Sequence, residues 1–140
     1  KSTLARRLAE DAEFFGNRRI LLFQEIEYHL TEDTVGKEIA SWSVKGDEPA
    51  FTAFGKLDTA RDPYTLSRGE LKRLLLSCIL SSDADCLILD EPYSSLDLDA
   101  KETLTELIRG RLGVTILFTH EMPNIDAVFW EIREGKLCRM

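Results

Sequence analysis

Long apolar runs are missing from this 140-residue sequence, and so is an excess of basic charge. No apolar run approaches the roughly 20 residues that a helix needs to cross a bilayer. The start, KSTLARRLAEDAE, lacks the apolar centre of a secretory signal. The 18 Lys and Arg stand against 25 Asp and Glu, for a net charge of −7. This balance argues against a domain that grips a nucleic-acid backbone, so no nucleic-acid partner is expected. It does not exclude a small polyanion, which a few cations and backbone amides can hold.

Cysteine is scarce, with three residues that lie far apart and form no CxxC pair. Cys78 and Cys86 stand among apolar residues, whereas Cys138 is close to the C-terminal end. We interpret the cysteines as reduced thiols of a cytosolic protein rather than as a disulfide framework.

Short apolar segments alternate along the chain with segments of helical spacing. Three runs are predicted to be buried strands: RILLF (19–23), CLILD (86–90) and VTILF (114–118). A turn-like FGNR (15–18) precedes the first of them. This alternation is typical of an α/β fold with a largely parallel sheet. The length and the hydrophobic content of 44% predict one soluble domain spanning residues 1–140.

Two segments place apolar residues on one helical face. The first helix is expected to begin near Gly69, and the second is expected to stop at Gly113. The apolar positions are Leu71, Leu74, Leu75, Cys78 and Ile79 in the first helix, and Leu104, Leu107, Ile108 and Leu112 in the second. Residues 31–65 are more polar and predict a small helical insert. The C-terminal AVFWEIREGKLCRM predicts a closing hairpin that turns at Glu134-Gly135.

Polar residues follow each of the three predicted strands. Gln24 follows RILLF, Asp90 and Glu91 end CLILDE, and Thr119 and His120 follow VTILF. Parallel strands bring their carboxyl ends to one edge of the sheet, and ligands of such folds bind beyond that edge. The sequence therefore predicts a functional site there.

The pair Asp90-Glu91 has an ordinary interpretation and a functional one. Acidic residues are common at solvated strand ends, and nothing in the pair alone excludes this. The functional interpretation is a Walker B pair, in which Asp90 holds Mg²⁺ through water and Glu91 deprotonates an attacking water. Strand alternation would point the two carboxylates to opposite sides, and Pro92 would end the strand.

The first three residues, KST, read as the close of a P-loop. Lys1 would reach the β- and γ-phosphates, Ser2 would bind Mg²⁺, and the helix that contains Thr3 would face the phosphates with its N-terminus. The same residues also suit an ordinary helix start. Because no phosphate-cradling glycines precede Lys1 in the sequence, we expect that the chain begins inside this motif.

The stretch LSRGE, residues 66–70, precedes LILDEP, SSLD and a TH pair at 119–120. Together these motifs resemble those of the nucleotide-binding subunits of ATP-binding-cassette (ABC) proteins, whose signature is LSGGQ. The resemblance covers nearly the whole chain, and the spacing from Ser67 to Asp90 is like that of the family. It implies a P-loop-type α/β fold with a small helical subdomain, and ATP with Mg²⁺ as cofactors.

The resemblance also implies roles for individual residues. Ser67, Arg68 and Gly69 would contact the γ-phosphate of ATP held by a second subunit. Asp97 would end the D-loop, and His120 would be the switch histidine. Gln24 would be the Q-loop glutamine, which contacts magnesium and the attacking water. Taken singly, His120 is better explained as a structural histidine, and Gln24 as a surface glutamine.

A narrower resemblance concerns LLFQEIEYHLTEDTVGKEIA, which is similar to the Q-loop region of energy-coupling-factor and cobalt-type importer ATPases. RDPYTLSRGE resembles their run into the signature. In those transporters the segment after the Q-loop contacts the membrane partner, so residues 25–38 are the implied docking surface.

Several residues depart from the family pattern. Arg68 replaces the first signature glycine, Glu70 replaces the usual glutamine, and Tyr93 stands where a small residue is more usual. An arginine at that position could donate to phosphate, or crowd a backbone that prefers glycine. The stretch from Lys1 to Gln24 is also shorter than in the family.

The leading hypothesis is an ATP-hydrolysing subunit of an ABC importer, working as a homo- or heterodimer on the cytoplasmic face of a membrane. A non-transport ABC ATPase of the DNA-repair or translation type is the second hypothesis. Its chromosome-maintenance relatives carry a long coiled coil before the signature, and no sustained heptads occur here. The third hypothesis is a degenerate subunit that binds ATP with little hydrolysis. The signature residue Arg68 favours this alternative, whereas the presence of Glu91 argues against it.

Overall fold

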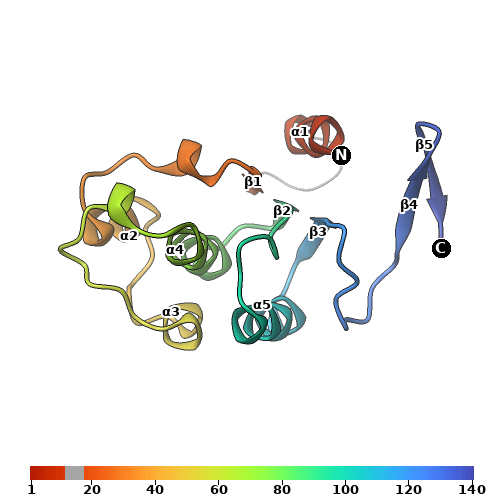
Figure 1. Cartoon of the computed structure of the whole chain (residues 1–140). Helices are drawn as coiled ribbons and strands as arrows, with labels where there is room; N and C mark the ends of the chain where they lie inside the picture. The colour runs from red at the N-terminus through yellow and green to blue at the C-terminus, as the bar shows by residue number, and fades with distance from the viewer. Residues whose placement is uncertain (12–17) are drawn as a thin grey trace.

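Three parallel strands form the central sheet, in the order β1-β2-β3 (Figure 1). The computed structural model describes residues 1–11 and 18–140, so most of the predicted FGNR turn lies outside the described residues. A separate antiparallel hairpin follows at the C-terminal end. The strands are β1 (Arg19–Leu22), β2 (Cys86–Asp90), β3 (Val114–Phe118), β4 (Trp130–Arg133) and β5 (Lys136–Arg139). The α/β class and the three predicted sheet strands are confirmed.

Helices cover both faces of this sheet. The α-helices are α1 (Ser2–Glu10), α2 (Val35–Ser41), α3 (Pro49–Phe54), α4 (Arg68–Ser81) and α5 (Leu98–Gly110). The described residues also form two short 3-10 helices, η1 (Ile26–His29) and η2 (Pro63–Thr65). In Figure 1, α1 lies on one face, whereas α4 and α5 lie on the other.

Strand β2 is buried along its whole length and divides the core in two. Cys86 and Ile88 pack with Ala5 of α1 in the smaller cluster. Leu87 and Leu89 belong to the larger cluster, which is shared with α4 and α5. This alternation is what a strand requires, because successive side chains point to opposite faces.

Residues 31–65 contain α2, α3 and η2, and α2 and α3 pack beside α4 (Figure 1). Val35, Ile39, Phe51 and Phe54 are buried in the larger cluster with the apolar residues of α4. Thr34 caps α2 by accepting a hydrogen bond from the Lys37 amide. The segment therefore shares its core with the sheet rather than forming a core of its own.

The connection from α5 to β3 differs from the prediction. Helix α5 ends at Gly110, so Leu112 is not on its apolar face and is 91% exposed. The Arg111 guanidinium donates to the carbonyls of Ala84 and Val114, which draws the chain out of the helix toward β3. Gly113 lies in this connection with φ of +92°, and a Cβ there would stand 2.7 Å from the Asp85 carbonyl oxygen.

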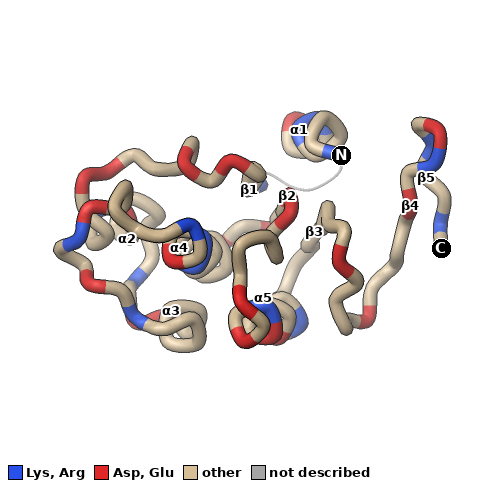
Figure 2. The backbone as a smooth tube through the Cα atoms, in the orientation of Figure 1, with Lys and Arg blue, Asp and Glu red and all other residues tan. Residues whose placement is uncertain are grey.

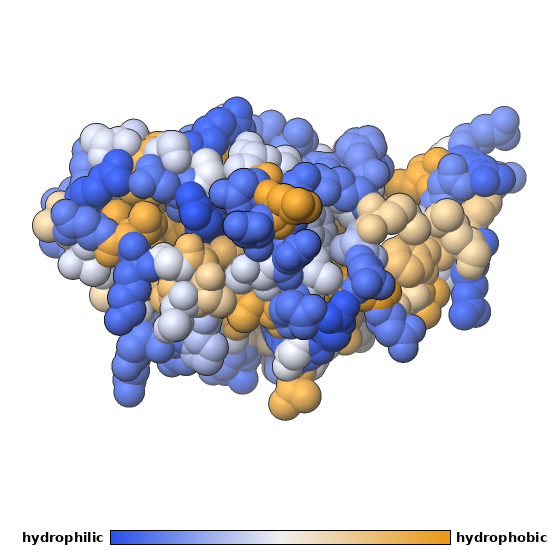
Figure 3. Space-filling model, turned by 60° about the horizontal axis from the view of Figure 1, so that its bottom comes forward, coloured by the Kyte–Doolittle hydropathy of each residue, from blue (hydrophilic) through white to orange (hydrophobic). Residues whose placement is uncertain are grey.

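The C-terminal hairpin turns where the sequence predicts. Glu134 and Gly135 have φ of 49° and 78°, the left-handed pair that a two-residue hairpin favours. The hairpin stands apart from the central sheet in Figure 1. Figure 3 shows hydrophobic residues gathered at this end of the molecule. Exposed apolar side chains of the hairpin and of the segment just before it include Val128, Trp130, Ile132 and Leu137.

No helix within the described residues is long and apolar enough to cross a membrane.

Candidate functional site

The carboxyl end of β2 delivers Asp90 to the side of the sheet that α1 covers. Asp90 follows Cys86 and Ile88 in the strand alternation, and it is buried. Ser2, the first residue of α1, donates a hydrogen bond from its hydroxyl to Asp90 Oδ2 at 2.5 Å. The helix packing on this face therefore brings the start of the chain to the end of its central strand.

Glu91 is directed by a turn and not by strand alternation, which corrects the prediction above. The strand ends at Asp90, and Glu91 adopts φ of +50°. Its amide donates to the Phe118 carbonyl at 2.7 Å, and its carbonyl accepts a hydrogen bond from Ser94 Oγ. A left-handed backbone at a non-glycine residue persists only where the surroundings hold it in place, and such positions cluster at functional sites.

Lys1 and His120 complete a group around Glu91. The Lys1 ammonium donates to the Thr119 carbonyl at 3.0 Å and contacts His120 Nδ1 at 3.1 Å. It lies 3.8 Å from Glu91 Oε1, while His120 Nε2 lies 3.2 Å from the same oxygen. Lys1 and His120 therefore approach the same buried oxygen of Glu91.

We call Lys1, Ser2, Asp90, Glu91 and His120 the edge cluster. Figure 2 shows the basic start of α1 close to the acidic end of β2. Opposite charges and a hydroxyl converge where the carboxyl ends of β2 and β3 meet, as the sequence predicts for this edge.

The other predicted site residues lie outside this cluster. Gln24 is exposed in the bend after β1, and Thr3 is exposed in the first turn of α1. Asp97 caps α5 by accepting a hydrogen bond from the Ala100 amide. Within residues 1–11 and 18–140, no hydrogen bond or ion pair joins the edge cluster to Thr3, Gln24, Ser67, Arg68, Gly69 or Asp97.

The signature residues build the start of α4. Ser67 Oγ accepts a hydrogen bond from the Glu70 amide, and the Glu70 carboxylate accepts one from the Ser67 amide. These bonds, together with the Arg61 guanidinium, hold the pKa of Glu70 below its usual value. In this capping box, the Ser67 hydroxyl acts as the N-terminal cap of the helix.

Gly69 and Arg68 differ in how much space the surrounding backbone leaves for a side chain. A Cβ on Gly69 would stand 3.1 Å from the Ser95 carbonyl oxygen, so the loop after β2 approaches α4 closely here. Arg68 is exposed in the first turn of α4 and has no left-handed backbone. An arginine at this position therefore does not strain the chain, and its guanidinium is free to reach outward.

One charged residue that the sequence reasoning missed is Lys72. Its side chain is 1% exposed, on a helix that is buried on nearly every side. Burial lowers its pKa from 10.5 to about 8, and Arg68 adds to this, while Asp90, Glu91 and Glu27 act in the opposite direction. The available signal was the largely apolar stretch LLLSCIL (74–80) that follows in the same helix, since a helix apolar all round is buried.

A buried carboxylate, Glu38, was also missed. It is completely buried in α2 and accepts hydrogen bonds from the amides of Thr31 and Glu32 and from Trp42 Nε1. It stands between Lys37 and Ile39 in a segment of mixed polarity, so no pattern marked this carboxylate as an internal residue.

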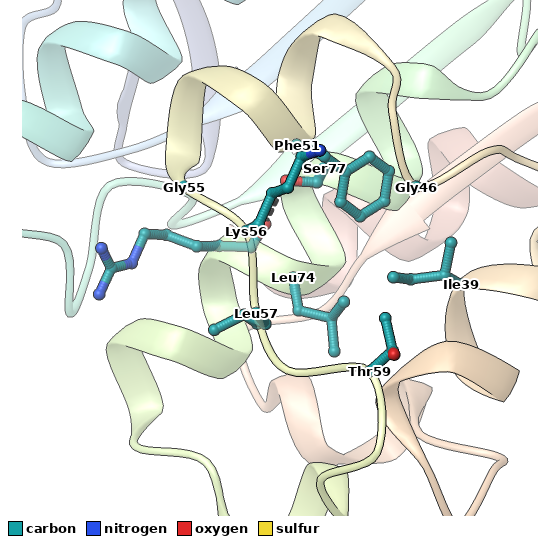
Figure 4. A pocket seen from close by; sticks show the side chains of 10 residues that line it. Ile39, Gly46, Phe51, Gly55, Lys56, Leu57, Thr59, Leu74 and Ser77 are labelled. Atoms are coloured by element: carbon teal, nitrogen blue, oxygen red, sulfur yellow. Dashed lines mark hydrogen bonds between the residues drawn. The ribbon is translucent and has the colours of Figure 1, made fainter.

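A separate small cavity of about 70 Å³ lies among α2, α3 and α4 (Figure 4). Its size is well below the several hundred Å³ typical of ligand pockets. The residues around it include Ile39, Phe51, Leu57, Thr59, Leu74 and Ser77. The edge cluster therefore remains the candidate functional site.

The edge cluster fits a magnesium ion that is shared with phosphates. Ser2 Oγ and Asp90 Oδ2 are close together, and Glu91 Oε1 is buried without a hydrogen-bond partner in the described part of the chain. No group of three or more His, Cys, Asp or Glu residues forms a metal site in that same part. Mg²⁺ commonly takes one or two protein oxygens and completes its shell with water and phosphate, so this small set suffices.

Comparison with known proteins gives relatives among transporter ATPases. A protein described as an ABC transporter ATP-binding protein, from Methanosarcina acetivorans, is 30% identical over 133 residues. The match covers 85% of this chain and 48% of that protein. The energy-coupling factor transporter ATP-binding protein EcfA2 of Bacillus subtilis is 31% identical over 124 residues, covering 76% of this chain and 45% of the relative. No protein-family model matches the chain.

Solved structures share the fold. One described as a cobalt transport ATP-binding protein has a TM-score of 0.62 at 21% identity, covering 75% of this chain and 42% of that one. The archaeal ribosome recycling factor aABCE1, solved with the stalk protein aP1, has a TM-score of 0.65 at 25% identity. That match covers 84% of this chain and 26% of the solved chain.

The chain spans about half the length of the curated relatives that it matches. Over most of its own residues, it is a homologue of the ATP-binding proteins of ABC transporters, with relatives of the energy-coupling-factor type.

Proposed function

We propose that this chain carries the ATP-hydrolysing residues of an ABC importer subunit, of energy-coupling-factor type, which energises solute uptake across a membrane. The observation that carries the proposal is the convergence of the edge cluster beside Glu91. Lys1, Asp90 and His120 come from three separate elements, and each suits one part of phosphoryl transfer.

Each residue of the cluster has a chemical task in this proposal. The Lys1 ammonium binds the β- and γ-phosphates of ATP in place of its present partners. Ser2 and Asp90, with Gln24, would hold Mg²⁺, and the bound ion would neutralise charge on the phosphates. Glu91 takes the proton from the attacking water, and His120 holds the γ-phosphate by its exposed ring.

A second subunit completes the site. The start of α4 presents Ser67, Arg68 and Gly69 at the surface, and the exposed Arg68 guanidinium is a further donor for phosphate. We propose that these residues contact ATP held by the partner, with Asp97 at the same junction. Both a homodimer and a heterodimer are compatible with these surfaces.

Residues 25–38 form the proposed docking surface for a transmembrane subunit, which would place the protein on the inner face of the cell membrane. Tyr28 is 79% exposed there. It lines an open groove of about 540 Å³ together with Phe23, Arg6 and Arg19. An exposed aromatic residue beside a groove is typical of an interaction site.

A translation-type ABC ATPase is the second candidate function. The likeness to the ribosome recycling factor favours it, whereas the curated relatives named above favour transport. A degenerate subunit is less favoured, because Glu91 and His120 are present and lie against each other.

The experiment is a Glu91→Gln substitution in the full gene product. We expect ATP binding and ATP-dependent dimerisation to persist, while phosphate release falls by about 100-fold or more, as for loss of a general base. Glu102→Gln, at an exposed position of α5, is the matched control and should keep full activity. Undiminished phosphate release by the Glu91 variant would remove this role from Glu91.

A further inference from the structure

The bend that contains Gln24 is closed by a side-chain hydrogen bond. Strand pairing between β1 and β2 ends at Leu22 and Leu89. The next amide, that of Phe23, donates to His29 Nε2 at 3.0 Å. The bond joins the two ends of a short loop, and Gln24 is the first residue inside it.

The imidazole that closes this loop is itself held by aromatic neighbours. Its ring centre lies 5.1 Å from that of Phe23, with the planes inclined by 31°, and 6.5 Å from that of Trp42, inclined by 43°. Ile26 and Leu30, on either side of His29 in the chain, are buried in the core. Packing on both sides restricts the rotamers available to the ring.

The chain of contacts continues into α2. Trp42 Nε1 donates to Glu38 Oε1 at 3.1 Å, and Glu38 Oε2 accepts from the amides of Thr31 and Glu32, both at 3.0 Å. Because Glu38 is fully buried, this network has little freedom to move. The bond from His29 to Phe23 therefore ties the bend to a rigid anchor.

We propose that His29 is a positioning residue, whose unprotonated Nε2 holds the Phe23 amide and thereby fixes the bend that presents Gln24 to the edge cluster. The proposal rests on the role of Gln24 in the proposed function. A ring nitrogen accepts a hydrogen bond only while it carries no proton, so an imidazolium cannot hold this amide. Without the bond, the short loop regains conformational freedom.

Burial and a nearby cation favour the neutral form of the His29 ring. Burial lowers the pKa of His29 from its usual 6.5, and Lys72 of α4 lowers it further. Glu38 of α2 acts in the opposite direction, but less strongly. The imidazole is therefore neutral at neutral pH, which is the state that the hydrogen bond requires.

Two substitutions separate the bond from the packing. His29→Gln keeps an acceptor at the place of Nε2 but does not titrate, and His29→Phe keeps an aromatic ring but has no acceptor. In the full gene product, we expect His29→Phe to lower kcat for ATP by about five- to tenfold, the scale of one hydrogen bond, with KM little changed. His29→Gln should keep kcat within about twofold of the unchanged protein at neutral pH.

The pH dependence of ATPase activity tests the hydrogen bond directly. If His29 had only a packing role, the bond would not affect this dependence. Activity of the unchanged protein, divided by that of His29→Gln, should be constant above pH 7 and fall as the pH drops through the His29 pKa. His120 and the carboxylates are common to both proteins, so they cancel in this ratio. A ratio that stays flat while NMR shows the His29 ring becoming protonated, or a His29→Gln variant as impaired as His29→Phe, would overturn the proposal.

A test without hydrolysis separates this inference from the proposed function. In the NMR spectrum of the unchanged chain, the Phe23 amide should exchange slowly with water at pH 7. Its protection should fall about tenfold as His29 protonates. An amide that exchanges rapidly at pH 7 would overturn the proposal even if ATP is hydrolysed. Slow, pH-linked exchange in a protein with no ATPase activity would keep the His29 bond and reject the proposed function. Because this readout needs only the unchanged chain, it does not depend on whether His29→Phe folds.

Discussion

Lys72 is a residue that lowers the stability of the fold. Its side chain is buried in α4, and its ammonium has neither a hydrogen bond nor an ion pair within residues 1–11 and 18–140. The charges of Asp90, Glu91 and Glu27 favour its charged form, but burial outweighs them and lowers its pKa to about 8. A buried charge without a close partner is retained at a cost in free energy of unfolding.

The sign of this effect predicts a pH dependence. Between pH 8 and 10.5 the unfolded chain keeps a proton on Lys72 that the folded chain has lost, so the contribution of Lys72 to stability rises with pH across this window. The buried Cys78 thiol, whose pKa is raised to about 12, acts in the opposite direction from about pH 9, so the rise is clearest between pH 8 and 9. We expect Lys72→Met to raise the free energy of unfolding at pH 7 by about 1–3 kcal/mol and to remove that rise. Urea unfolding at pH 7 to 10 measures both effects.

The exposed Lys45 offers a matched control for this substitution. Lys45→Met should leave the stability at pH 7 and its rise with pH as they are in the unchanged chain. A Lys72→Met variant that kept the alkaline rise would show that another group causes it.

At the scale of elements, α4 joins the signature to the core. Its first turn is closed by the capping box of Ser67 and Glu70, and its next two turns bury Leu71, Leu74 and Leu75. The close approach of Gly69 to Ser95 places this helix start against the loop that follows β2. A helix whose N-terminus is fixed in this way presents its free amides in a defined direction.

The capping bond predicts a measurable loss of stability. Ser67→Ala removes the acceptor of the Glu70 amide, and we expect the free energy of unfolding to fall by about 1 kcal/mol. Ser67→Thr keeps the hydroxyl and should lose much less. Chemical unfolding of the three proteins gives the comparison, and equal losses for alanine and threonine would contradict the capping explanation.

At the scale of the whole molecule, charge and apolar surface are unevenly placed. The edge cluster lies on one side of the sheet, whereas exposed Trp130 and Leu137 lie on the C-terminal hairpin. The proposed docking surface, with Tyr28, lies beyond the carboxyl end of β1. The groove beside Tyr28 and the Gln24 bend are thus neighbours in the chain and in space, so docking and catalysis would share one loop.

The docking surface predicts a partner that can be recovered. The full gene product, purified from detergent-solubilised membranes, should carry with it a membrane protein with several spans. Tyr28→Glu should abolish this association, because a charge in a docking groove is costly to desolvate. Tyr64, which is also well exposed, supplies the control variant Tyr64→Glu. Recovery of soluble partners alone would favour the translation-type ABC ATPase.

Much of the fold could be predicted because its signals are local. RILLF, CLILD and VTILF are short apolar runs, and a buried parallel strand needs little more. Ser67 with Glu70 specifies a helix start through contacts three residues apart, and Glu134-Gly135 specifies a turn in the same way. The position of Asp90 and His120 at one edge of the sheet could be predicted because parallel strands end at the same edge.

Local patterns thus predict where most strands and helices lie, and which edge of the sheet collects polar groups. The left-handed turn at Glu91, the burial of Lys72 and the bond from Phe23 to His29 arise only in the folded chain. The end of α5 before Leu112 is also a result of folding, because the chain must turn there to place β3 beside β2. Each of these features depends on groups that meet only when distant segments or a loop fold together, and such contacts leave no periodic trace in the sequence.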